Sequence, residues 1–127
     1  MDDRFRIAVA VGLGGAVGTT TRAVIASLLS RWGAAGLWGV LFVNIVGALA
    51  LGWYAARVRH TPRWSATVAG FVAVGLLGSF TTFSAFSLEV VDLFADGSWL
   101  SGTAYAMGSV GAGLTAALVG RSMAARS

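Results

Sequence analysis

Four long hydrophobic stretches follow one another along the chain, separated by three short polar segments. The stretches cover, in chain order, residues 5–29, 34–56, 65–94 and 98–119. A helix needs about 20 mostly apolar residues to cross the hydrocarbon core of a bilayer, and each stretch is long enough. The polar segments are too short to form a further domain. The pattern therefore predicts an all-α membrane protein in which residues 1–127 form one domain of four transmembrane helices.

Composition supports this interpretation and narrows the possible functions. Of the 127 residues, 57% are hydrophobic and 11% are charged, whereas soluble proteins carry about 25% charged residues. This balance excludes a soluble enzyme, a nucleic-acid-binding module and a disordered tail. The chain has no cysteine for a disulfide or thiolate site, and His60 alone cannot build a multi-histidine metal centre within one subunit. No catalytic group of residues or nucleotide motif is visible, so we do not expect an enzyme.

The arginines are distributed unevenly across the predicted membrane. With four spans, both termini and the central loop share one side, which collects seven of the nine basic residues, namely Arg4, Arg6, Arg57, Arg59, Arg63, Arg121 and Arg126. At most Arg22 and Arg31 belong to the other side. The positive-inside rule therefore predicts cytoplasmic termini in a plasma (inner) membrane of the bacterial type. Because the arginines flank hydrophobic spans, we interpret them as topology signals and not as a nucleic-acid-binding surface.

Small residues recur at helical spacing on two of the spans. Gly14 and Gly18 form such a step in the first span, and Gly108, Gly111 and Gly113 give the fourth span a narrow face. Small residues let helix backbones approach closely in lipid, where no hydrophobic effect drives helices together. We expect both faces to be helix-packing surfaces.

Polar residues inside the predicted spans are candidates for function, because placing them in a membrane costs stability. Arg22 ends the apolar part of the first span, Asn44 lies in the middle of the second, and Glu89 lies late in the third. The third span also contains a run of hydroxyl and aromatic residues, 78–87. Such a run is typical of a broken helix whose freed backbone groups line a cavity or hold an ion. It is equally compatible with a continuous helix whose hydroxyls bond back to the preceding turn.

Three phenylalanines, Phe80, Phe83 and Phe86, recur every third residue within this run. Stripes of this kind are usually packed in a core. Alternatively, the positive edges of the rings can face an anion that has lost part of its water. Side-chain hydrogen-bond donors for an anion are available at Asn44, Ser84, Tyr105 and Ser109. A cation pathway would normally carry a carboxylate at mid-membrane. The predicted spans offer hydrogen-bond donors and aromatic rings there instead, which favours an anion pathway.

At these positions the sequence resembles the fluoride channel family (Fluc, also called CrcB) along essentially its whole length. The resemblance rests on three motifs: Gly14 to Gly18 with Arg22, residues 39–47 around Asn44, and residues 75–86 followed by Glu89. It implies a subunit of four helices with a break in the third, which dimerises in antiparallel fashion around two pores. The function it implies is passive export of cytoplasmic fluoride, which gives fluoride resistance.

The resemblance also implies roles for individual residues. Phe83 and Phe86 match the pore phenylalanines, Asn44 matches the pore asparagine, and Tyr105 and Ser109 match polar pore-lining positions on the fourth helix. Arg22 matches an arginine at the pore vestibule, and Glu89 matches a recurrent acid that follows the phenylalanines. The carbonyls of Gly78 and Thr81 match those that hold a structural sodium ion at the dimer interface. The chain departs from the usual family pattern at Val40, Ser79, Ala85 and Gly113.

The partner in such a dimer is either a second copy or a related chain. Insertion in both orientations favours a balanced arginine distribution, and seven against two is a strong bias. Our hypothesis is a heterodimer in which an oppositely oriented paralogue supplies pore hydroxyls that Val40 and Gly113 lack.

Two other functions fit the number of spans. A small multidrug transporter couples proton exchange through a glutamate deep in its first span, where this chain has Arg22 and no glutamate. A structural subunit of a membrane complex would explain the glycines and arginines but not the cluster at residues 78–87.

Overall fold

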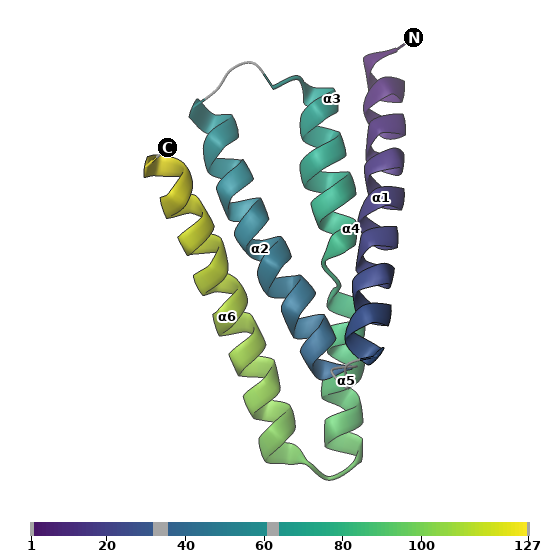
Figure 1. Ribbon diagram of the computed structural model, residues 1–127, viewed down its shortest axis with the longest axis vertical. Coiled ribbons are helices and arrows are strands. Elements are labelled where there is room, and N and C mark those ends of the chain that lie inside the picture. Colours follow the sequence, from purple (N-terminus) through teal and green to yellow (C-terminus); the bar gives the residue numbers. More distant parts are fainter. Residues whose placement is uncertain (1, 32–35, 61–63, 127) are drawn as a thin grey trace.

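The computed structural model describes residues 2–31, 36–60 and 64–126, and these residues form helices joined by short connections (Figure 1). Three helices are long and cross the whole molecule, namely α1 (Asp3–Arg31), α2 (Leu37–His60) and α6 (Trp99–Arg126). The third predicted span consists of four successive pieces, which are α3 (Ala66–Ala69), the π-helix η1 (Gly70–Leu77), α4 (Gly78–Phe80) and α5 (Phe83–Ala95).

Within the described residues, four helical segments are long and apolar enough to cross a membrane, which confirms the predicted number of spans. Several helices continue beyond the predicted ends: α1 reaches Arg31 instead of residue 29, α2 reaches His60 instead of 56, and α6 reaches Arg126 instead of 119. Hydropathy marks where the apolar core of a span ends, but the backbone gains from continuing its hydrogen bonds into the polar zone. The predicted start of the second span at residue 34, and Arg63, lie outside the described residues.

The helices associate as two pairs that lie side by side (Figure 1). α1 packs along α3, η1 and α4, while α2 packs along α6. The pairs meet where α2 contacts α1, η1 and α4, and α5 packs against α2 and α6. The start of α1, the end of α2 and the end of α6 lie at one end of the molecule, and the connection from α5 to α6 lies at the other. This arrangement places both chain ends on one side of a membrane, as an even number of spans requires.

Gly97 makes the reversal between α5 and α6 possible. Its φ of +75° lies in the left-handed region that favours glycine. The amide of Ser98 donates to the carbonyl of Leu93 at 2.9 Å, and the amide of Gly97 donates to that of Phe94 at 3.1 Å. This pair of bonds is a Schellman motif, which satisfies carbonyls at the end of α5 where no helical donor follows.

Glycines set the distance between the paired helices. A Cβ at Gly14 or Gly18 would overlap backbone oxygens of η1, as expected for the predicted packing step. On α6 the predicted face does not pack against another helix of the same chain, because a Cβ at Gly108, Gly111 or Gly113 would meet open space. The close contact on that helix comes instead from Gly120, where a Cβ would overlap the carbonyl oxygen of Leu49 on α2. Spacing alone identified small residues but not the side of α6 that faces α2.

We predict that Gly120→Ala destabilises the protein by roughly 1–3 kcal/mol, because α2 and α6 must separate to accommodate the added methyl group. Gly111→Ala, on the same helix but with open space around it, serves as the control and should change stability by less than about 0.5 kcal/mol. Thermal unfolding of the purified protein in detergent measures both effects. Equal stability of the two variants would contradict the packing described here.

Candidate functional site

The third span is broken at Thr81 and Thr82, between α4 and α5. Both residues have extended backbone, with φ and ψ of −76° and 157° at Thr81 and of −143° and 120° at Thr82. Of the two structures compatible with the sequence, the broken helix is therefore confirmed. Thr82 is buried, with 8% of its surface exposed, so its backbone groups cannot rely on solvent.

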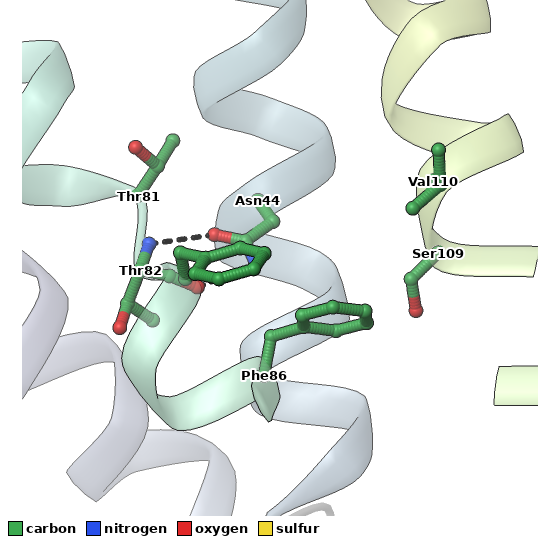
Figure 2. Close-up of a pocket in the computed structure, with 7 residues that line it drawn as sticks. Asn44, Thr81, Thr82, Phe86, Ser109 and Val110 are labelled. Atoms are coloured by element: carbon green, nitrogen blue, oxygen red, sulfur yellow. Dashed lines mark hydrogen bonds between the residues drawn. The ribbon is translucent and has the colours of Figure 1, made fainter. Parts of the chain in front are cut away.

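Asn44, which lies on α2, forms hydrogen bonds with the backbone of the third span at the break (Figure 2). Its Oδ1 accepts a hydrogen bond from the Thr82 amide at 2.8 Å, and its Nδ2 donates to the Thr82 carbonyl at 3.0 Å. One side-chain amide thus supplies both partners of one extended residue, much as a neighbouring strand would. Unsatisfied backbone groups are costly inside a membrane, so this pair of bonds is what permits the break.

The two threonines of the break use their hydroxyls differently. The hydroxyl of Thr82 caps α5 by accepting from the amide of Ala85 at 3.2 Å, and it shares a hydrogen bond of 3.2 Å with the hydroxyl of Ser84. The hydroxyl of Thr81 donates to the carbonyl of Leu77 at 3.2 Å, one turn back. Thr82 is a site residue that was not among those predicted from the sequence. The signal was present, because threonine is a preferred residue at a helix N-terminus and Thr82 precedes the apolar start of α5.

The break leaves the carbonyls of residues 78–81 without their regular helical donors, and for two of them the donor amide bonds elsewhere. In a continuous helix the amide of Thr82 would donate to Gly78 and that of Ala85 would donate to Thr81. Here the Thr82 amide bonds to Asn44 and the Ala85 amide bonds to the Thr82 hydroxyl. The amides that would bond to the carbonyls of Gly78 and Thr81 in a continuous helix therefore bond to other groups. The family resemblance associates these two carbonyls with sodium.

Arg22 reaches the same break from α1. Its Nε donates to the carbonyl of Ser79, close to the end of α4, at 3.2 Å. A cation near the C-terminal end of a helix satisfies a free carbonyl and interacts favourably with the helix dipole. Arg22 also lines a cavity of about 210 Å³ together with Thr82, Val40 and Ala85, so two of the positions that depart from the family pattern lie beside it.

The three phenylalanines of the stripe have different environments. Phe80 is buried, Phe86 is half-buried and Phe83 is 80% exposed in this chain. The ring centroids of Phe83 and Phe86 are 5.7 Å apart with the planes at 42°. Phe86 lies at the same centroid distance from the ring of Tyr105 on α6, with the planes at 38°. The three rings, from Phe83 through Phe86 to Tyr105, therefore form a row that leads from the break to α6.

A pocket of about 250 Å³ opens beside this row (Figure 2). Its walls bring together four of the predicted pore residues with the two residues of the break and one aliphatic residue of α6, namely Asn44, Phe83, Phe86, Ser109, Thr81, Thr82 and Val110. The hydroxyl of Ser109 is buried and has no hydrogen-bond partner within the described part of the chain. Apart from a weak interaction with the hydroxyl of Tyr105, it is a donor without a partner among the described residues.

The remaining predicted site residues lie around this pocket without lining it. The hydroxyl of Tyr105 contacts Oε2 of Glu89 at 2.5 Å and lies 3.3 Å from the carbonyl oxygen of Leu37. The carboxylate of Glu89 is therefore held away from the pocket by a residue of α6. Ser84 follows the break but its hydroxyl is engaged with Thr82, and Gly78 precedes the break within α4.

Comparison with known proteins identifies the family. Residues 9–121 match the family described as CrcB-like protein, Camphor Resistance (CrcB). The chain belongs to the CrcB family. Among its relatives, a protein of Rhizobium meliloti (strain 1021) named fluoride-specific ion channel FluC is 40% identical over 87% of this chain and 89% of its own length. A protein of the same name from Roseiflexus sp. (strain RS-1) is 33% identical over 91% of this chain and 94% of its own length.

Membership of the CrcB family confirms the resemblance drawn from the motifs around Arg22, Asn44 and Phe83. It also confirms that the chain is not an enzyme, because the family is one of ion channels. The geometry of the break also gives a physical reason why Asn44 and Arg22 occur in one sequence with residues 78–86. Both side chains bond to backbone groups of this segment.

We predict that Asn44→Ala loosens the break, since the buried amide and carbonyl of Thr82 both lose their partner. A buried polar group left without a partner costs about 1–3 kcal/mol, so the stability of the protein should fall by at least that amount. Hydrogen exchange at residues 79–87, followed by mass spectrometry, should be markedly faster than in the unchanged protein.

Thr21→Ala is a suitable control for this variant. The Thr21 hydroxyl donates only to the carbonyl of Val17 in its own helix and is exposed, so its loss should leave exchange at the break unchanged. Unaltered exchange at residues 79–87 in Asn44→Ala would contradict the role assigned to Asn44.

Proposed function

We propose that this chain is a subunit of a fluoride-selective channel through which cytoplasmic fluoride leaves the cell passively. The observation that carries the proposal is the pocket at the helix break, which combines two phenylalanine rings with hydrogen-bond donors and has no carboxylate among its described lining residues. The relatives named fluoride-specific ion channel FluC, at 33–40% identity over most of the chain, support the same ion.

The donors of the pocket suit a small anion. Nδ2 of Asn44 carries two hydrogens, of which one bonds to the Thr82 carbonyl, so the second is available. The hydroxyl of Ser109 provides another donor from the opposite wall. Fluoride is strongly hydrated, and a pore must replace its water without binding it too tightly. A few neutral donors and ring edges meet this requirement, whereas a fixed arginine in the pocket would hold the ion.

Export needs no energy source in this mechanism. A membrane potential that is negative inside expels a monovalent anion with about 2.3 kcal/mol per 100 mV. The weak acid HF enters from acidic surroundings, dissociates in the cytoplasm and leaves as fluoride through the channel. The protein contributes a selective route, and this agrees with a chain in which no catalytic group is recognised.

A second subunit completes the pocket in this proposal. Phe83 is 80% exposed although it lies in the middle of a span and lines the pocket. An antiparallel partner would cover Phe83 and bring its own phenylalanines to the same region. We propose a plasma-membrane location with cytoplasmic termini, and the arginine bias favours a heterodimer over a homodimer.

A structural sodium ion fits the break. Na⁺ is a hard cation that takes oxygen ligands, and the carbonyls of Gly78 and Thr81 have both lost their regular helical donors. These two carbonyls, with their counterparts from the second subunit, would hold the ion at the interface. Its charge would stabilise the oxygens of the break when bound.

The alternatives drawn from the sequence receive less support. A multidrug transporter of this size needs a carboxylate deep in its first span, and between its ends α1 carries Arg22 instead. A structural subunit would not require the donors and rings to converge on one pocket.

Efflux from fluoride-loaded liposomes tests the proposal. The protein, reconstituted alone or with any paired paralogue, should release fluoride and retain chloride. Phe83→Ile and Phe86→Ile keep the apolar volume but remove the ring edge, so efflux should fall to background while folding is preserved. Phe42→Ile is the matched control, because Phe42 is exposed on α2 and lines none of the cavities described here. Unchanged efflux in both pore variants would rule out the ring-edge mechanism.

Topology distinguishes the two kinds of dimer. When the chain is expressed alone with a tag at its C-terminus, we predict that nearly all termini are cytoplasmic, because seven arginines lie on that side. Accessibility of the tag to a membrane-impermeant reagent measures the two orientations. Equal numbers on both sides would instead support a homodimer.

A further inference from the structure

A second concave surface lies between α2 and α6, well away from the break. Its volume is about 490 Å³, the largest among the cavities described here. The floor is formed by small residues of both helices, including Gly52, Ala56 and Ala117, and by the two leucines Leu114 and Leu118 of α6. The helices approach closely beneath it, since a Cβ at Gly52 would overlap the carbonyl oxygen of Ala117. We call this surface the α2–α6 groove.

Two arginines stand at the end of the groove. Arg59 and Arg121 both line it and both are exposed. Within the described part of the chain, the only ion pair joins Arg6 to Asp3 on α1, a helix that does not contact α6. The neighbouring Arg57 lies over the ring of Trp53, 5.7 Å from its centroid. The groove therefore ends in two guanidinium groups that no carboxylate of the described residues neutralises.

The groove is charged at one end and apolar along its length, as a phospholipid is. Its arginines lie near the ends of α2 and α6, at the end of the molecule where α1 starts (Figure 1), and its small apolar residues extend from there toward the middle of the membrane. We propose that the α2–α6 groove binds one anionic phospholipid, with its phosphate on Arg59 and Arg121 and an acyl chain along the floor. The fork of donors on each guanidinium matches phosphate oxygens in pairs.

This occupant fits the groove better than a free anion does. A small anion would use the two arginines but would leave the apolar floor beside Leu118 uncovered. A lipid with no net charge would cover the floor but would not neutralise the two positive charges. The site also differs from the fluoride pocket, because the two cavities share no lining residue. The proposal therefore stands whether or not the chain conducts fluoride.

Native mass spectrometry of the purified protein tests this site, with phosphatidylglycerol and phosphatidylcholine of identical acyl chains as probes. A basic residue next to an anionic headgroup contributes about fivefold in affinity, so two arginines should favour phosphatidylglycerol by about thirtyfold. In the double variant Arg59→Gln and Arg121→Gln this preference should disappear. Arg126→Gln, which removes an exposed arginine of α6 outside the groove, should keep it.

A second variant tests the floor independently of charge. Ala55 also lines the groove and is exposed, so Ala55→Leu should fill part of the floor and weaken retention of phosphatidylglycerol with both arginines present. Equal phosphatidylglycerol retention by the double variant and the unchanged protein would overturn the proposal. So would displacement of the lipid by glycerol 3-phosphate at equal concentration, because the site would then be a simple anion site. A changed ratio of monomer to dimer with unchanged lipid selectivity would assign the groove to a second copy instead.

Discussion

A backbone amide and a backbone carbonyl inside a membrane each need a partner, and the rest of the structure depends on how this need is met at Thr82. A continuous helix would meet it without any side chain. Asn44 meets it instead, by accepting from the Thr82 amide and donating to the Thr82 carbonyl. Because α2 supplies both bonds, the third span can stop at Phe80 and restart at Phe83. The beginning of α5 at Phe83 determines the direction of this helix. The direction of α5 in turn places Phe83 and Phe86 in the wall of the pocket.

The same hydrogen bonds leave backbone oxygens at the break without helical donors. The Thr82 amide donates to Asn44 and the Ala85 amide donates to the Thr82 hydroxyl. The carbonyls of Gly78 and Thr81 therefore lack their regular helical donors. The carbonyl of Ser79 is satisfied by Arg22 from the other side of the break. Donors from two neighbouring helices therefore converge on a segment that exposes oxygens. A break of this kind concentrates polar groups at mid-membrane without placing a carboxylate in the pocket, because Glu89 is bound to Tyr105 outside it.

The amino-acid sequence was sufficient to predict the number of spans and the polar residues that gather at the site. It could not decide whether the third span was broken, because Thr81 and Thr82 have the same chemistry but different partners. Thr81 bonds back to Leu77 as it would in a continuous helix, whereas the backbone of Thr82 bonds to a residue 38 positions away. The glycines of α6 were ambiguous for a similar reason. Both Gly111 and Gly120 are small, and only the docking of α2 determines that Gly120 makes the close contact.

In the proposed channel, the exposed ring of Phe83 is the reason to expect a second subunit. A phenyl ring in lipid gains nothing from lying beside hydrogen-bond donors, yet Phe83 shares a pocket with Asn44 and Ser109 and its ring is tilted against that of Phe86. Such a ring contributes to selectivity only when a second surface excludes lipid from the pocket and leaves room for an ion. The partner must bring that surface to mid-membrane while leaving the α2–α6 groove open at its arginine end. An antiparallel arrangement meets the first requirement, because it places the breaks of both subunits at the same depth.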